Sequence, residues 1–355
     1  MEAPAEPGLS SPIVPQSAIA TFHSVLRKTE QVYARLMELK EKGWNNPKGD
    51  EHFKQQRHRA DNTKGQDAVT FYRMMQQIGD EMQANTSAFS HVNQAQPEDD
   101  IRILDLCMAP GGYTSTALKY SPRAKATGIT LPPSQGGHKV ILNSPRSTVL
   151  YQDITMFAKE FGVDDNEIPA KHPARASFLA EQPFVNQKFD LVICDGQVLR
   201  THKRPEYREA NEATRLTCSQ LILALQRIRQ GGTLIMLLHK IEAWDTMELL
   251  YLFSRFSDIE LFKPVKKHAI RGTFYLIAKN MQPDAEAANE AVRAWKRAWW
   301  NATFGGEEGT GAARMRVDDG YAQSVIDSFG EKFTVLAKPV WSIQADALSR
   351  SDFVR

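Results

Sequence analysis

Two charged side chains, each at the end of an apolar run, are the residues of this sequence best suited to chemistry. Asp195 follows the run at residues 189–194 and precedes Gly196, and Lys240 closes the run that begins after Gly232. A carboxylate can orient an amine and stabilise a cation, and a neutral lysine can take a proton from a nucleophile. A single charge at a strand end usually points into solvent, but two opposite charges at adjacent strand ends favour a shared cleft. We therefore predict an acid–base site here.

A glycine turn lies upstream of this pair, between an apolar run and a helix-like segment. Residues 105–113 read Asp-Leu-Cys-Met-Ala-Pro-Gly-Gly-Tyr. Strand, glycine turn and helix start in that order predict a mononucleotide-binding unit with a ligand at the helix N-terminus. Pro110 replaces the Gly-x-Gly-x-x-Gly spacing of dinucleotide binders, and no Lys-Ser/Thr pair follows as in a phosphate-binding loop.

The string from residue 105 to residue 113 resembles the S-adenosylmethionine (SAM) turn of the FtsJ-like ribose 2′-O-methyltransferases. The resemblance covers roughly residues 67–280. It implies SAM as the cofactor, and it implies that the cofactor contacts Asp105, Cys107, Met108, Ala109, Pro110, Gly111, Gly112, Tyr113, Thr130, Asp153, Ile154 and Asp195.

FtsJ-like enzymes use a Lys-Asp-Lys-Glu tetrad, and the resemblance transfers it in an altered form. Asp195 matches the aspartate in its Cys-Asp-Gly context, and Lys240 matches the second lysine. Arg73 stands at the position of the first lysine and Thr273 at that of the glutamate. Because arginine stays protonated, Arg73 can orient a substrate hydroxyl and lower the pKa of Lys240, but it cannot be the base. Lys240 is therefore the predicted base, and Thr273 contributes a hydrogen bond without charge.

Seven apolar runs predict the strands that must position these residues, at 101–106, 124–130, 148–151, 189–194, 232–238, 258–263 and 273–279. Helix-like stretches mostly alternate with them, which is typical of a parallel sheet covered on both faces. Residues 264–272 are too few for a helical crossover, so the last two strands should be antiparallel. The predicted fold class is α/β, a Rossmann-like methyltransferase sheet with helical N- and C-terminal extensions.

The remaining segments predict the domain organisation. Residues 1–15 have the composition of a disordered tail, 16–66 predict a helical extension, 67–280 the methyltransferase domain and 281–355 a C-terminal extension. Apolar spacing predicts helices over 17–42, 67–82 and 284–301, and the tryptophans of the last one should dock on the domain. Prolines argue against one continuous helix in the long connection at residues 155–188.

Composition narrows the class of protein. A chain of 355 residues with 42% hydrophobic residues can bury a sizeable core, and its net charge of +2 means that any polyanion site must come from local clustering. Cys107, Cys194 and Cys218 have no Cys-x-x-Cys spacing, which argues against a disulfide framework or a zinc cluster. We expect no metal, no membrane partner, and location in the cytoplasm or nucleus.

Three basic clusters should surround the predicted site. They are Lys54, Arg57, Arg59 and Lys64 before the Arg73 helix; Arg200, Lys203, Arg204 and Arg208 after the Asp195 strand; and Lys263, Lys266, Lys267, His268 and Arg271 between the last two strands. Basic residues around one pocket favour a polyanion, so RNA is the expected substrate. Two alternatives stay open: an O-methyltransferase for a small molecule, and a protein that binds SAM or RNA without transferring methyl.

Overall fold

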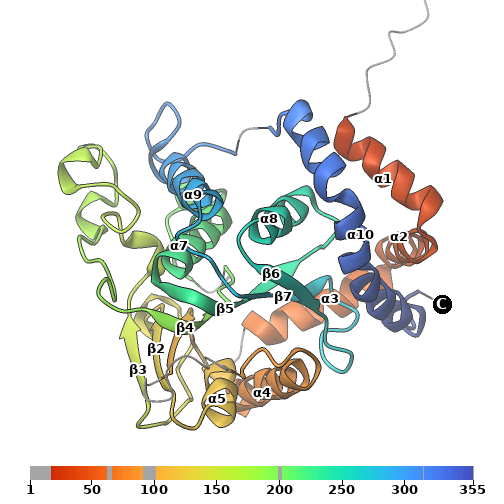
Figure 1. The fold of residues 1–355 in the computed structure, drawn as a ribbon, viewed down its shortest axis with the longest axis horizontal. Helices are drawn as coiled ribbons and strands as arrows, with labels where there is room; N and C mark the ends of the chain where they lie inside the picture. The colour runs from red at the N-terminus through yellow and green to blue at the C-terminus, as the bar shows by residue number, and fades with distance from the viewer. Residues whose placement is uncertain (1–16, 62–65, 91–100, 199–201, 315, 355) are drawn as a thin grey trace, which may run out of the picture.

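The computed structural model describes residues 17–61, 66–90, 101–198, 202–314 and 316–354, and the predicted tail at 1–15 lies outside these ranges. Within them the centre is a seven-stranded sheet of order β3-β2-β1-β4-β5-β7-β6 (Figure 1). The strands are β1 (Arg102–Leu106), β2 (Lys125–Thr130), β3 (Ser147–Tyr151), β4 (Phe189–Cys194), β5 (Ile228–His239), β6 (Asp258–Phe262) and β7 (Thr273–Lys279).

The sheet is parallel from β3 to β5 and antiparallel at its other end. β7 runs antiparallel to both β5 and β6, so the predicted reversed final pair and the Rossmann-like α/β class are confirmed. Leu106 of β1 pairs with Ile129 of β2 and with Cys194 of β4, which brings the carboxyl ends of these strands level. Met236 pairs with Cys194, so β5 continues for three residues beyond this edge.

Alternating side chains of the central strands build two cores, one on each face of the sheet. On one face, Ile103, Ile193 and Ile235 belong to the core that includes side chains of α4 (Gln66–Thr86) and α5 (Gly112–Tyr120). On the other face, α7 (Glu212–Arg227), α8 (Trp244–Ser254) and α9 (Glu286–Phe304) complete the larger core. Figure 1 shows these two helical layers on opposite sides of the sheet.

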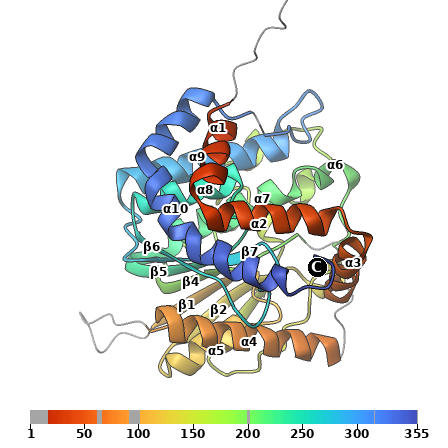
Figure 2. The same cartoon turned by 90° about the vertical axis from the view of Figure 1, so that its right-hand side faces the viewer.

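The N-terminal helices pack against the last helix of the chain. α1 (Ala18–Thr29) and α2 (Gln31–Trp44) both contact α10 (Asp319–Ser349), as Figure 2 shows. The prediction of one helix over 17–42 was wrong, because Glu30 adopts an extended conformation (φ −112°, ψ 94°) that separates α1 from α2. A further helix, α3 (Pro47–Asp61), begins at a proline, which the first helical position tolerates because its N–H has no intrahelical partner.

Short elements complete the described chain. They are α6 (Glu206–Glu209) and the 3₁₀ turns η1 (Pro133–Gln135), η2 (Ile154–Met156), η3 (Asp165–Glu167) and η4 (Arg175–Ser177). The long connection before β4 thus holds only single turns, as its prolines predicted. Trp295 and Trp299 of α9 are buried, which confirms their docking, whereas Trp300 is exposed. No helix in the described ranges is both long and apolar enough to cross a membrane.

Candidate cofactor and substrate pocket

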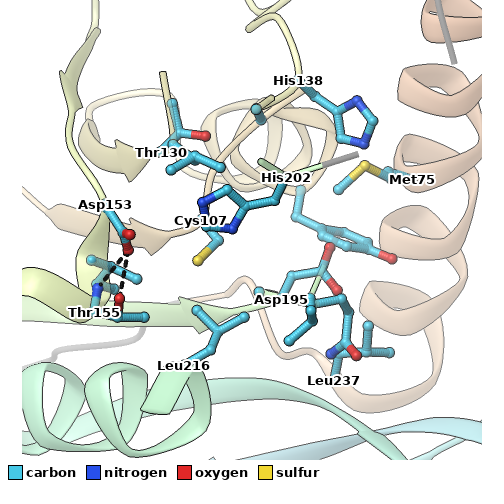
Figure 3. A pocket seen from close by; sticks show the side chains of 18 of the residues that line it. Met75, Cys107, Thr130, His138, Asp153, Thr155, Asp195, His202, Leu216 and Leu237 are labelled. Carbon is cyan, nitrogen blue, oxygen red and sulfur yellow. Dashed lines mark hydrogen bonds between the residues drawn. The ribbon is translucent and has the colours of Figure 1, made fainter. Parts of the chain in front are cut away.

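A pocket lies at the carboxyl edge of the sheet and extends across several strands (Figure 3). The space between its lining atoms, including the part open to solvent, is about 1020 Å³. We call the part lined by Thr130, Asp153 and Ile154 the β3 end, and the part lined by Leu237, His268 and Tyr275 the β7 end. Asp195 lines the pocket after β4, the strand that separates β1 from β5 in the sheet.

Seven of the residues predicted to contact the cofactor line this pocket: Cys107, Ala109, Tyr113, Thr130, Asp153, Ile154 and Asp195. The other five, Asp105, Met108, Pro110, Gly111 and Gly112, do not line it. Asp105 and Met108 are buried, and a Cβ on Gly128 would meet the Met108 side chain at 2.4 Å, so this methionine packs on β2.

The two glycines of the turn serve packing within the protein. Gly111 has φ +96° and precedes α5, a conformation that glycine adopts without strain. A Cβ on Gly111 would lie 2.8 Å from Leu142, and one on Gly112 would lie 2.4 Å from Met75 of α4. The close approach that these glycines allow is therefore to Leu142 and to α4, and neither glycine lines the pocket.

Two buried carboxyl groups stand behind and within the pocket. Burial raises the pKa of Asp105 to about 7, although a hydrogen bond from the Thr114 hydroxyl opposes this shift. Burial, and then the neighbouring Asp105, raises the pKa of Asp195 well above its usual range. Asp195 Oδ1 is buried and has no hydrogen-bond partner, which leaves it available to a bound ligand. A cationic ligand would favour ionisation of this acid.

Asp153 at the β3 end belongs to a buried ionic network. Its Oδ2 lies 3.1 Å from Arg208 Nη2, and its Oδ1 accepts from the Thr155 N–H (3.0 Å) and hydroxyl (2.8 Å). Burial alone would raise the pKa of Asp153, but Arg208 and the bonds from Thr155 hold it below the usual value. Arg208 also pairs with Glu212 at 2.8 Å. Arg208, predicted as part of a surface cluster, is therefore an internal residue that fixes Asp153.

The C-terminal extension supports the same loop. The Trp299 indole N–H donates to the Thr155 carbonyl at 3.2 Å, and Arg215 Nη2 donates to the same oxygen at 3.3 Å. Arg215 Nε in turn donates to the Thr303 hydroxyl at 3.1 Å. Sequence reasoning did not foresee this, because the helical pattern of α9 shows an apolar face but not the loop on which it rests.

Of the four predicted catalytic residues, only Asp195 lines the pocket. Arg73 is exposed on α4, whose Phe71, Met74 and Met75 face the pocket instead. Lys240 is exposed beyond the end of β5, with φ +50°, and Leu237 is the lining residue from that strand. Among the described lining residues there is no lysine or arginine.

Thr273, the fourth predicted catalytic residue, is buried and takes part in a chain of neutral groups that reaches the pocket. Its hydroxyl lies 3.2 Å from His239 Nδ1, and His239 Nε2 lies 2.9 Å from Gln197 Oε1. Gln197 lines the pocket two residues after Asp195. The loop between them is held by Gln220, whose Oε1 accepts from the Gly196 N–H at 2.8 Å. Gln197 and Gln220 were not predicted as site residues, because uncharged side chains in these positions gave no sequence signal.

The basic clusters contribute fewer surface charges than predicted. Lys266 and Lys267 are exposed between β6 and β7, but Lys263 is buried and donates to three backbone carbonyls. Lys203 is exposed, whereas Arg204 pairs with Glu209 at 2.6 Å. Lys54 is exposed on α3, and the side chains of Arg57, Arg59, Lys64 and Arg200 lie outside the described part of the chain. No cluster of potential metal ligands occurs among the described residues.

Comparison with known proteins places the chain in a family. The sequence model of FtsJ-like methyltransferases matches residues 84–281, more than half of the 355 residues. The chain belongs to the FtsJ-like methyltransferase family. The predicted methyltransferase class and SAM cofactor are thereby confirmed. The orphaned Asp195 oxygen and the ordered Asp153 carboxylate at separate points of one pocket are consistent with a cofactor that is both cationic and hydroxyl-bearing.

Relatives and solved structures resemble the chain more distantly. It is 25% identical over 160 residues to ribosomal RNA small subunit methyltransferase B of Klebsiella pneumoniae subsp. pneumoniae, a match that covers 42% of this chain and 32% of the relative. The chain thus spans about a third of that relative's length. A ribosomal RNA methyltransferase structure from Plasmodium falciparum has 19% identity and a TM-score of 0.35, covering 57% of this chain and 93% of that one. Human methyltransferase-like protein 13 with SAH has 15% identity and a TM-score of 0.35, covering 69% and 97%.

Proposed function

We propose that this chain transfers a methyl group from SAM to a ribose 2′-hydroxyl of RNA. The observation that carries the proposal is the charge at the β7 end of the pocket. The charges of Arg271, Lys263 and Lys267 act on the His268 ring that lines this end. A pocket with cationic surroundings at its substrate side is suited to a phosphate-bearing acceptor.

The β3 end is suited to the nucleoside part of the cofactor. The Asp153 carboxylate, kept ionised by Arg208 and Thr155, can accept hydrogen bonds from hydroxyl groups. Thr130 and Ile154 flank it with a hydroxyl and an apolar surface. Because Arg208 and Thr155 already fix this carboxylate, binding needs little reorganisation there.

Asp195 is suited to the charged centre of the reaction. Bound SAM supplies an electrophilic methyl group on a positively charged sulfur. A buried carboxylate near that charge orients the donor, and the buried surroundings strengthen the attraction. The apolar wall of Phe71, Met74 and Met75 excludes water from the same space.

A methylation assay tests the proposal. The full chain would be incubated with methyl-labelled SAM and unmodified ribosomal RNA transcripts, and the RNA digested to nucleosides. We expect label in 2′-O-methylated nucleosides and about a 100-fold or greater loss in Asp195→Ala. Asp258→Ala, at an exposed position on β6, is the control for loss of a carboxylate outside the pocket lining. Label only in bases, or none in RNA, would contradict the ribose assignment.

One observation favours a second candidate, a protein that binds SAM or RNA without transferring methyl. The described pocket lining holds no lysine or arginine, so no amine stands ready there to take a proton. Calorimetry with SAM, alongside the methylation assay, separates the two functions. Tight SAM binding together with no transfer to any RNA would select the binding protein.

A further inference from the structure

The loop between β6 and β7 (residues 264–272, the hairpin loop) brings one polar side chain into the pocket. That side chain is His268, whose Nδ1 is buried and has no hydrogen-bond partner. Asp195 Oδ1 is the other pocket-lining polar atom that is buried and orphaned among the described residues. Buried polar atoms in native proteins are nearly always paired, so two orphans in one pocket point to groups of a ligand.

The hairpin loop is held so firmly that the position of His268 is fixed. The His268 carbonyl accepts from the Arg271 N–H at 3.0 Å and from Lys263 Nζ at 3.4 Å. The Lys263 ammonium also donates to the carbonyls of Arg271 (2.7 Å) and Thr273 (2.9 Å). His268 itself has φ +58°, an uncommon conformation for a residue with a side chain.

Two helices, α4 and α10, also form hydrogen bonds to the hairpin loop. Glu81 of α4 accepts from the Val265 N–H at 2.8 Å, and Gln344 of α10 donates to the Ile270 carbonyl at 3.3 Å. A backbone in an unfavourable conformation persists when its surroundings over-determine it, and such residues cluster at functional sites. The loop is thus a rigid support for the imidazole.

Strand order decides which substrate faces His268. In the sheet, β2 and β3 lie on one side of β4, and β5, β7 and β6 lie on the other. The β3 end takes the nucleoside part of SAM in the function proposed above, with the reacting methyl toward Asp195. The acceptor must approach from the opposite side of Asp195, where His268 and Leu237 line the pocket.

We propose that His268 is the catalytic residue that accepts the proton of the attacking ribose hydroxyl, a role for which the described lining residues include no amine. The inference rests on the proposed function. The hydroxyl oxygen forms the bond to the methyl carbon, the electron pair of the carbon–sulfur bond stays on sulfur, and the hydroxyl proton passes to His268 Nδ1. The imidazolium then returns this proton to solvent.

The protonation state of His268 suits this role. Burial, with the charges of Arg271, Lys263 and Lys267, lowers the pKa of His268 to about 3, so the ring is neutral at physiological pH and can accept a hydrogen bond. A hydroxyl that is being alkylated becomes much more acidic than an imidazolium, so even a weak base receives its proton late in the reaction. The rate should therefore not depend on titration of this base between pH 6 and 9.

The experiment compares His268→Gln with Lys240→Ala in the full chain, using labelled SAM and unmodified ribosomal RNA transcripts. We expect His268→Gln to lower kcat by about 100-fold or more, within the range of general-base effects, while calorimetric Kd values for SAM and RNA change less than about threefold. His52→Gln is the matched control, since the His52 ring lies tilted against Phe353, with ring centroids 5.1 Å apart, and does not line the pocket. Full activity of His268→Gln, or loss of transfer in Lys240→Ala but not in His268→Gln, would overturn the inference.

Two further readouts separate this inference from the proposed function. A lysine base would give a rate that rises about tenfold per pH unit over this range, because the lysine amine titrates near about 10.4. A tenfold rise per pH unit that continues to pH 9 contradicts His268, and its absence supports His268. A change that levels off above about pH 8 also supports it, because burial lowers the pKa of the neighbouring Lys263 to about 7 and that group titrates there. In ¹⁵N spectra with SAH bound, added RNA should shift the His268 Nδ1 resonance, assigned by its absence in His268→Gln. If the wild-type chain methylates no ribose, the proposed function fails; if it does so while this resonance is unmoved, the inference alone fails.

Discussion

Replacing Asp105 with asparagine should make the stability of this protein less sensitive to pH. Burial raises the pKa of Asp105 from 3.8 to about 7, so the folded state holds this proton more tightly than the unfolded state. A raised acid pKa means that folding stability falls as pH rises from about 4 to about 7, where the unfolded chain has released its proton. At about 1.36 kcal/mol per pKa unit, the free energy of unfolding above pH 7 is lower than that below pH 4 by on the order of 4 kcal/mol because of this group.

Asp105→Asn removes this titration and keeps the shape of the side chain. The asparagine oxygen can still accept the hydrogen bond from the Thr114 hydroxyl. Urea unfolding at pH 5 and pH 8, without cofactor, should show that the wild type loses several kcal/mol more than the variant between these two values. Asp258→Asn, at an exposed position on β6, controls for loss of a carboxylate. Parallel stability curves for wild type and Asp105→Asn would refute the reasoning.

Three other perturbations test the packing and the charges around the pocket. Gly111→Ala should lower the free energy of unfolding by about 2 kcal/mol or more and weaken SAM binding, because alanine is strained at φ +96° and its Cβ would lie 2.8 Å from Leu142. The control is Gly231→Ala, which has φ +78° but open space around the added Cβ and should cost about 1 kcal/mol. Lys263→Met should speed amide hydrogen exchange in residues 264–272, since three carbonyls each lose the hydrogen bond from Lys263, and unchanged exchange would contradict the bracing role. Replacing both Lys266 and Lys267 with alanine should reduce the slope of log K for RNA binding against log salt concentration by between about 1 and 2 in magnitude. An identical slope would mean that neither lysine contacts phosphate.

The strands were predictable because burial on both faces leaves apolar runs that turns interrupt. Six of the seven predicted strands agree with the structure within one residue at each end, and β5 begins four residues earlier, at Ile228. Helix boundaries depended on conformations that the residue types did not reveal. Glu30 breaks a helical pattern without a proline or glycine, and Pro339 lies inside α10 without ending it. Packing against neighbouring elements overrides local preference at such positions.

Site residues could be predicted only where they directly follow a strand that ends level with the strands beside it. Asp195 directly follows β4, so topology alone brings it to the edge of the sheet. Lys240 follows β5 in the same way, but β5 extends three residues past the end of β4, and Lys240 has φ +50°. No residue pattern shows how far a strand continues beyond the strand beside it. His268 was visible as one member of a basic run, but its direction depends on contacts of the hairpin loop.

The match to the family ends at residue 281, yet the protein does not divide there. Trp299 is fully buried and bonds to the loop that bears Asp153, so α9 supports this part of the pocket wall from behind. A chain shortened to residue 281 would lack the Thr303 hydroxyl that Arg215 bonds and the indole donor of the Thr155 carbonyl. The segment that the family model matches and the packed structure thus have different limits, because side chains of α9 complete the core of the matched segment.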